Sequence, residues 1–228
     1  MKSRSTLVVA AHPDDEVLGC GGTIHRLTQS GTSVNIVFLA DGVSSREGNE
    51  NDFTSELDAR RRSAIEASKI LGANVPTFLD FPDNQLDTVP LLNIIKLIEG
   101  EIENHGPDTV ITHFGNDLNI DHRIANGAVV VACRPQAKSP VKKVLFFEVP
   151  SSTEWQMENG QPMFVPNYFV DTTEHLEFKL RALRCYSMEM RDWPHSRSIE
   201  AVEHLGRWRG ASVCSDAAEA FILGRQYS

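Results

Sequence analysis

The chain has 228 residues, 41% of them hydrophobic, and its formal net charge at pH 7 is −9. This length and apolar content suit one sizeable core, so we expect a single domain over residues 1–228, whereas the acidic balance argues against a nucleic-acid-binding surface. No apolar run approaches the roughly 20 residues that cross a bilayer, and an acidic cluster follows too early for a secretory signal, so we expect a cytoplasmic protein without membrane insertion.

Short apolar runs alternate with helical patterns over the first two thirds of the chain. The runs are continuous and rich in β-branched residues, which is typical of strands covered on both faces. They cover Thr6–Ala10, Val34–Leu39, Val75–Leu79, Thr109–Thr112 and Val144–Phe147. The helical patterns cover Glu16–Gln29, Ser55–Leu71, Pro90–Asn104 and Asp121–Cys133, and several end at a glycine.

This alternation predicts a Rossmann-like, doubly wound α/β fold, with a mostly parallel sheet and helices on both faces. In such a sheet the first strand is central and the fourth lies on its other side, which opens a crevice at their carboxyl ends. The first strand is followed by Ala11–Glu16, with the sequence AHPDDE, and the fourth by the polar segment His113–His122. We therefore expect these two segments to meet at the crevice.

The region beyond about residue 150 is less regular. We expect extended pieces near 163–170, a helix from about Thr172 to Met188, and a loop-rich tail to Ser228. The core therefore covers about 1–150, and the C-terminal cap region, 151–228, is expected to wall the crevice.

The polar residues at the expected crevice match the ligands of a catalytic metal. His12 and Asp15 lie three residues apart at a strand-to-helix turn, and His122 can supply a third ligand from the opposite loop. Two imidazoles and one carboxylate, with the fourth position kept for water, form an open zinc site. The cysteines contain no C-x-x-C pair, so a thiolate site is not indicated. We therefore expect Zn²⁺, with another divalent metal as the alternative.

Two further acids have distinct expected roles. Asp14 adjoins a ligand without being one, so it can act as a general base and then donate the proton to a leaving nitrogen. Asp121 is a candidate for orienting a ligating imidazole from behind the metal site. The structural alternative is that proline and acids at this point only start a helix well. One acid alone is explained equally well by that alternative, but the combination with a distant histidine favours the metal site.

The motifs resemble those of one known family. VVAAHPDDEVLGCGGTI and NDLNIDHRIANGAVVVACRP are similar to the two signature motifs of the LmbE-like, or PIG-L, deacetylases, and weaker similarity extends to HSRS at 195–198 and AEAF at 218–221. The resemblance implies a Rossmann-like fold, zinc on His12, Asp15 and His122, and Asp14 as base. It further implies hydrolysis of N-acetyl groups from glucosamine-like, small-molecule substrates. The oligomeric state is left open, with a homo-oligomer among the alternatives.

The chain departs from the family at one position. Many members carry H-x-D-H where this chain has Asn119 in place of the first histidine. Asparagine can donate a hydrogen bond to a developing oxyanion but supplies no positive charge. We therefore treat Asn119 as a candidate in that role and His195, in the C-terminal region, as its candidate replacement. His113 either orients the site or caps the fourth strand.

Sugar recognition needs donors and acceptors on the same side of the sheet. Asp41 and Arg60 match family positions and are expected to bind substrate, with Arg46 and Asn84 as weaker candidates. A solvated surface charge is the alternative for each charged residue among them. Arg197, Arg209 and Glu219 lie in the tail and are open to the same two interpretations.

Two other functions compete with the deacetylase. A nucleotide-binding oxidoreductase is suggested by the glycines at 19–22, but the G-x-G-x-x-G pattern fails at Ile24 and the acids of AHPDDE would repel a pyrophosphate. A non-catalytic sugar-binding or zinc-stabilised module is supported by the missing histidine at 119. A third possibility, within the hydrolases, is a deacetylase of a small-thiol pathway or of an antibiotic sugar, which uses the same chemistry on another aglycone.

Overall fold

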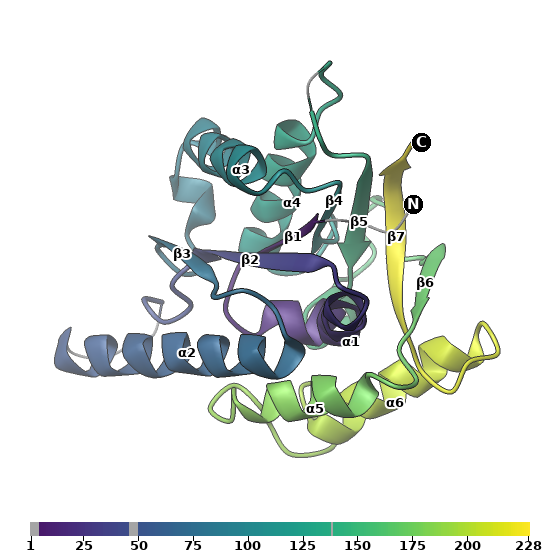
Figure 1. Cartoon of the computed structure of the whole chain (residues 1–228). Coiled ribbons are helices and arrows are strands. Elements are labelled where there is room, and N and C mark those ends of the chain that lie inside the picture. The colour runs from purple at the N-terminus through teal and green to yellow at the C-terminus, as the bar shows by residue number, and fades with distance from the viewer. Residues whose placement is uncertain (1–4, 46–49, 138) are drawn as a thin grey trace.

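The structure, a computed structural model, describes residues 5–45, 50–137 and 139–228, with the side chains of residues 50–52 excepted. The described strands form one sheet of seven, in the order β3-β2-β1-β4-β5-β7-β6 (Figure 1). The strands are β1 (Ser5–Ala10), β2 (Ser33–Ala40), β3 (Thr77–Phe81), β4 (Thr109–His113), β5 (Lys143–Phe147), β6 (Tyr168–Asp171) and β7 (Ala218–Gln226). The helices are α1 (Asp15–Gln29), α2 (Glu50–Leu71), α3 (Leu91–His105), α4 (Ile120–Ala132), α5 (Leu176–Arg184) and α6 (Ile199–Ala211).

The predicted fold class is confirmed. Strands β1 to β5 are parallel to one another, and β1 lies between β2 and β4, so the strand order reverses beside β1. All residues of β1 and β4 are buried, as continuous apolar runs predict. The third strand begins two residues later than expected, at Thr77.

Two hydrophobic cores lie on the two faces of the sheet. Val8 and Ala10 of β1 pack in the core beneath α1, α2 and α5, whereas Leu7 and Val9 face the core beneath α3 and α4. This alternation follows from the two-residue period of a strand. The same helix layers are seen on opposite sides of the sheet in Figure 1. Among the described helices, none combines the length and apolar composition needed to span a bilayer.

The C-terminal segment is more ordered than the expected loop-rich tail. It contains α5, α6, β6 and β7, and β7 pairs antiparallel with both β5 and β6. The expected helix from Thr172 to Met188 is present in part, as α5. The sequence of β7, AEAFILGRQ, has an apolar run of only four residues with Glu on one side and Gly and Arg on the other, so the run does not mark a strand of nine residues. Pairing on both sides stabilises a strand that local sequence does not predict.

Helix α1 is kinked in its middle, and the glycine-rich sequence at 19–22 explains why. Cys20 has a non-helical backbone, with φ −147° and ψ 23°. A Cβ atom at Gly19 would lie 2.2 Å from the ring of Phe147, so the helix approaches β5 closely there. Glu219 of β7 accepts hydrogen bonds from the N–H groups of Gly22 and Thr23 at 2.9 and 2.7 Å. These glycines therefore serve packing at the kink.

Candidate active site

A cavity of about 210 Å³ opens at the carboxyl ends of the parallel strands. The loops that follow β1 to β5 all contribute to it, and residues of the C-terminal segment complete one side. Apart from one glycine, every residue in its lining has a polar or charged side chain. The lining consists of His12, Asp14, Gly42, Ser45, Arg60, Asp83, Asn84, Asn119, His122, Ser151, Ser152, Glu189 and Arg197.

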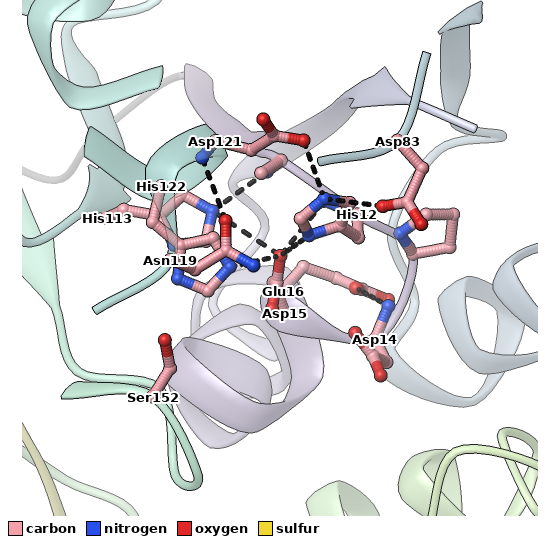
Figure 2. A network of polar contacts seen from close by, with 12 residues as sticks. His12, Asp14, Asp15, Glu16, Asp83, His113, Asn119, Asp121, His122 and Ser152 are labelled. Carbon is pink, nitrogen blue, oxygen red and sulfur yellow. Dashed lines mark hydrogen bonds and ion pairs between the residues drawn. The ribbon is translucent and has the colours of Figure 1, made fainter. Parts of the chain in front are cut away.

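The three expected metal ligands converge (Figure 2), and two of them, His12 and His122, line this cavity. Oδ2 of Asp15 lies 3.2 Å from Nδ1 of His12 and 3.3 Å from Nε2 of His122. All three side chains are buried. The turn between β1 and α1 is closed locally, because the N–H group of His12 donates to Oδ2 of Asp15 at 2.9 Å. Loops after two adjacent strands thus bring the three residues together.

The opposite nitrogen of each imidazole contacts a carboxylate. Nε2 of His12 lies 3.0 Å from Asp121 and 3.1 Å from Asp83. Nδ1 of His122 lies 3.0 Å from Oδ1 of Asp117. Such contacts orient a ligating imidazole and fix which nitrogen faces the metal. Asp121 therefore contacts an imidazole as expected, although its partner is His12 and not the adjacent His122.

Asp117 is held in its ionised form by several donors. Ser152 and Thr153, from the loop after β5, donate hydroxyl hydrogen bonds to it. Burial raises the pKa of this carboxyl, but the hydrogen bonds and the charge of His122 outweigh burial and lower the pKa to about 2. The loop after β5 thus supports a candidate ligand that comes from the loop after β4.

His113 both ends β4 and supports the site. Its Nε2 accepts a hydrogen bond of 2.8 Å from the N–H group of Ala11, and its ring stacks on His122 with centroids 4.0 Å apart. Burial, followed by the charge of His122, lowers the pKa of His113 well below its ordinary value. A neutral His113 therefore joins the end of β1 to the ring of His122.

The residues present fit a divalent metal. Two sets of side chains have ligand atoms within 4.8 Å of one another: His12 with Asp15 and His122, and His12 with Asp83 and Asp121. In the first set, Oδ1 of Asp15 is buried and has no hydrogen-bond partner among the described residues. In the second set, Asp121 already accepts hydrogen bonds from the N–H groups of two residues after β3. The unsatisfied carboxylate oxygen favours the first set.

Asp14 lies beside this set with its carboxylate facing two cations. Oδ2 of Asp14 accepts a hydrogen bond from Nη1 of Arg197 at 3.1 Å and lies 3.7 Å from Nη2 of Arg60. Burial raises the pKa of Asp14 to about 6, while Arg197 and Arg60 oppose that rise. Asp14 thus lines the cavity with an ionisable carboxylate and belongs to neither candidate set of metal ligands.

Arg60 makes more contacts with protein than its expected role in substrate binding suggests. Its guanidinium donates to the carbonyl oxygen of Pro13 at 3.0 Å and forms an ion pair of 2.7 Å with Glu189. The side chain is only 7% exposed. Arg60 thus lines the cavity while it fixes the backbone next to Asp14.

The remaining expected residues take varied positions. Asn119 caps α4, with Oδ1 accepting from the N–H group of Asp121 at 2.8 Å, and its Nδ2 donates to Asn84 at 3.1 Å. Oδ1 of Asp41 accepts hydrogen bonds from two backbone N–H groups of its own loop, and Asp41 is absent from the described lining. Arg46 lies outside the described residues.

The two expected residues of the segment 195–197 differ in position. Arg197 belongs to the described lining of the cavity, whereas His195 does not, and Nδ1 of His195 accepts a hydrogen bond from the N–H group of Arg197 at 3.0 Å.

Several residues at the site carry no assigned role in the sequence analysis. Asp83 follows β3, and its position just after a parallel strand could have identified it as a residue of the crevice. Asp117 lies in the segment after β4, but spacing alone does not show which nearby acid contacts His122. Glu189 follows α5 in an irregular segment, and the sequence offers no comparable signal for it. In the tail, Arg209 pairs with Glu148 outside the described lining of the cavity.

Comparison with known proteins identifies relatives of this chain. The family model PIG-L, described as GlcNAc-PI de-N-acetylase, matches residues 7–133. A diacetylchitobiose deacetylase of Thermococcus kodakarensis is 29% identical over 82% of this chain and 70% of its own length. A 4-oxalmesaconate hydratase of Pseudomonas putida is 27% identical over 89% of this chain and 83% of its own length. Relatives at similar distance thus include both a deacetylase and a hydratase.

The fold has a counterpart among solved structures. The N,N'-diacetylchitobiose deacetylase of Pyrococcus horikoshii superposes with a TM-score of 0.80 at 19% identity, covering 98% of this chain and 84% of that protein. At this identity the superposition bears on the fold alone. The family model spans both loops that supply the candidate ligands, from before His12 to beyond His122. The chain belongs to the PIG-L family.

Proposed function

We propose that this protein is a zinc-dependent hydrolase that removes the N-acetyl group from an amino sugar or amino-sugar conjugate. One observation carries the proposal. A buried carboxylate, Asp14, faces the cavity directly beside His12, Asp15 and His122, which form an open ligand set. A divalent cation held there would act as a Lewis acid and lower the pKa of a water molecule toward neutrality.

Asp14 moves the proton in this reaction. Its carboxylate accepts a proton from water as the oxygen attacks the amide carbon, and the protonated acid then donates to the nitrogen as the C–N bond breaks. The products are acetate and the free amine. Arg197 and Arg60 favour the ionised form of Asp14, which is the form that accepts the proton.

The cavity supports a sugar as the substrate. Its volume of about 210 Å³ is below the usual range for drug-sized ligands, roughly 300–1,000 Å³, which suits a single acylated sugar ring with any aglycone outside. Polar side chains such as Ser45, Asn84 and Ser151 offer donors and acceptors to hydroxyl groups. The diacetylchitobiose deacetylase among the relatives acts on an N-acetylated amino sugar, a disaccharide of which one ring could lie outside the cavity.

Hydration of an acidic substrate is the second candidate, because a hydratase is among the relatives. The cavity lining places three carboxylates, Asp14, Asp83 and Glu189, against two guanidinium groups. A divalent cation on the candidate ligands would offset the excess negative charge of this lining, so charge alone does not separate the two candidates. The sugar-specific deacetylase among the relatives and the largely polar lining favour the deacetylase.

Acetate release from a panel of N-acetylated sugars tests the proposal. The panel includes N-acetylglucosamine and N,N'-diacetylchitobiose, and metal content is measured on the same preparations. We expect acetate and a primary amine in equal amounts from at least one sugar, and a loss of about 10²–10⁴-fold in Asp14→Asn with the metal retained. A metal-loaded protein that releases no acetate from the whole panel, or an Asp14→Asn variant with wild-type turnover, would contradict the proposal.

A further inference from the structure

The backbone of Asp14 has an unusual conformation. Asp14 precedes the first residue of α1. Its φ of 123° and ψ of −29° lie in a backbone region that residues other than glycine rarely adopt. Its carbonyl oxygen accepts from the N–H groups of Val17 and Leu18 at 3.1 and 2.9 Å, which begins the helix. Such a conformation persists only where surrounding contacts hold it.

Glu16 and Tyr186 supply such contacts. The N–H group of Asp14 donates to Oε2 of Glu16 at 2.9 Å, and Figure 2 shows this contact beside the metal ligands. The hydroxyl of Tyr186, which follows α5, donates to Oε1 of Glu16 at 2.6 Å. Both side chains are buried, at 0% and 2% exposure, and neither is in the described lining of the cavity.

We propose that Glu16 and Tyr186 are positioning residues for the general base. Glu16 accepts the hydrogen bond of the Asp14 N–H group, and the first turn of α1 donates to the Asp14 carbonyl oxygen. Tyr186 holds the Glu16 side chain in place through its hydroxyl group. The result is that two consecutive carboxylates diverge: Asp15 faces His12 and His122, while Asp14 faces Arg197 and the cavity. The proposal rests on the proposed function of Asp14 as base.

A purely helix-stabilising role for Glu16 explains less of the geometry. An acid in the first turn stabilises a helix through the N-terminal dipole, and a solvent-facing side chain is enough for that. The carboxylate of Glu16 is instead buried, and each of its oxygens has its own donor, from Asp14 and Tyr186. A misplacement of about 1 Å at a reacting group can cost a hundredfold in rate, so the contact matters for catalysis.

Turnover, KM and metal content of Tyr186→Phe, Glu16→Ala and Glu16→Gln test the proposal. We expect kcat to fall about tenfold in Tyr186→Phe and about a hundredfold in Glu16→Ala, with KM and metal content unchanged. Glu16→Gln should recover part of the loss, because its amide oxygen can still accept from Asp14. Tyr168→Phe is the matched control, since the hydroxyl of Tyr168 contacts Lys143 in β5 and is absent from the described cavity lining.

Hydrogen exchange at the Asp14 amide gives a readout that needs no substrate. We expect protection in the wild-type protein and exchange at least about tenfold faster in Glu16→Ala, because the acceptor is lost. Wild-type kcat in both Tyr186→Phe and Glu16→Ala, or an Asp14 amide that exchanges equally fast with and without Glu16, overturns the proposal. If the wild-type protein releases no acetate, the proposed function fails, and exchange alone decides whether Glu16 holds the turn.

Discussion

The region up to the end of β5 and the segment that follows it contribute differently to the cavity. The first region carries all three candidate ligands and Asp14, in the segments after β1 and β4 that run into the first turns of α1 and α4. The second contacts Asp14 and a partner of His122: Arg197 contacts Asp14, and Ser152 contacts Asp117. The candidate ligands and the base thus lie in one region, and several of the groups that set their charge and orientation lie in the other. Each prediction below tests that division, beginning with the contacts that join the two regions.

The largest expected effect is on stability, at the kink of α1. Lys179 of α5 donates to the carbonyl oxygen of Leu18 at 2.9 Å and to Oε1 of Glu219 at 2.6 Å, and both charged side chains are buried. Lys179→Met leaves the charge of Glu219 buried without its cation. We expect the free energy of unfolding to fall by about 3–5 kcal/mol, measured by urea denaturation.

The control is Lys69→Met, because Lys69 pairs with Glu66 at the surface with 64% of its side chain exposed. That variant should change stability by less than about 1 kcal/mol. If Lys179→Met is equally mild, or melts the C-terminal segment in a separate transition, the two regions are joined less tightly than their shared sheet indicates.

The next effect concerns metal affinity. Asp117→Asn keeps an oxygen near Nδ1 of His122 but removes the charge that orients the imidazole. We expect metal affinity to fall about 10–100-fold, measured by competition with a chelator, while the fold is retained. Asp171→Asn, at the exposed end of β6, is the matched control and should bind metal as wild type does. Unchanged affinity in Asp117→Asn would show that His122 needs no such partner.

The sequence predicts the first region better than the second, for a physical reason. The ligands adjoin strand ends, and the rule that ligands bind where the strand order reverses brings AHPDDE and His122 together without knowledge of any loop. The carboxylates behind the imidazoles depend on loop conformation, so Asp121 was expected to orient an imidazole whereas Asp117 and Asp83 were not. Spacing cannot decide which acid reaches which ring.

The C-terminal contacts are harder to predict because nothing local determines them. Strand β7 owes its stability to pairing with β5 and β6, and its apolar run covers only four of its nine residues. Tyr186 lies near the end of the helix expected from Thr172 to Met188 and Glu189 just beyond it, and their partners Glu16 and Arg60 lie in distant parts of the chain. Arg197 was singled out only as one of several tail residues, and His195 was favoured over it for the site.

A smaller effect is expected at the base itself. Arg197→Ala removes a cation that opposes the burial-driven rise in the pKa of Asp14, so that pKa should rise above about 6. Less carboxylate is then present at neutral pH, and turnover should fall about tenfold at pH 7 and recover as the pH rises. Metal content should not change.

Arg209→Ala is the matched control, because Arg209 pairs with Glu148 outside the described lining of the cavity. Its rate and pH profile should match those of the wild-type protein. A pH profile of Arg197→Ala that also matches wild type would mean that the C-terminal segment does not tune the base.

The smallest effect is expected at Asn119, where the family's histidine is missing. Both polar ends of its amide are occupied, by the N–H group of Asp121 and by Asn84. Asn119→Ala should therefore cost about 1 kcal/mol of stability through the lost cap, and Asn119→Ser should restore most of it. Because both polar atoms of the amide already have hydrogen-bond partners, we expect turnover in Asn119→Ser to stay within about threefold of wild type. Loss of a donor to the oxyanion would instead lower turnover by roughly 10²–10³-fold. A loss of that larger size would place oxyanion stabilisation on Asn119, and hence wholly within the first region.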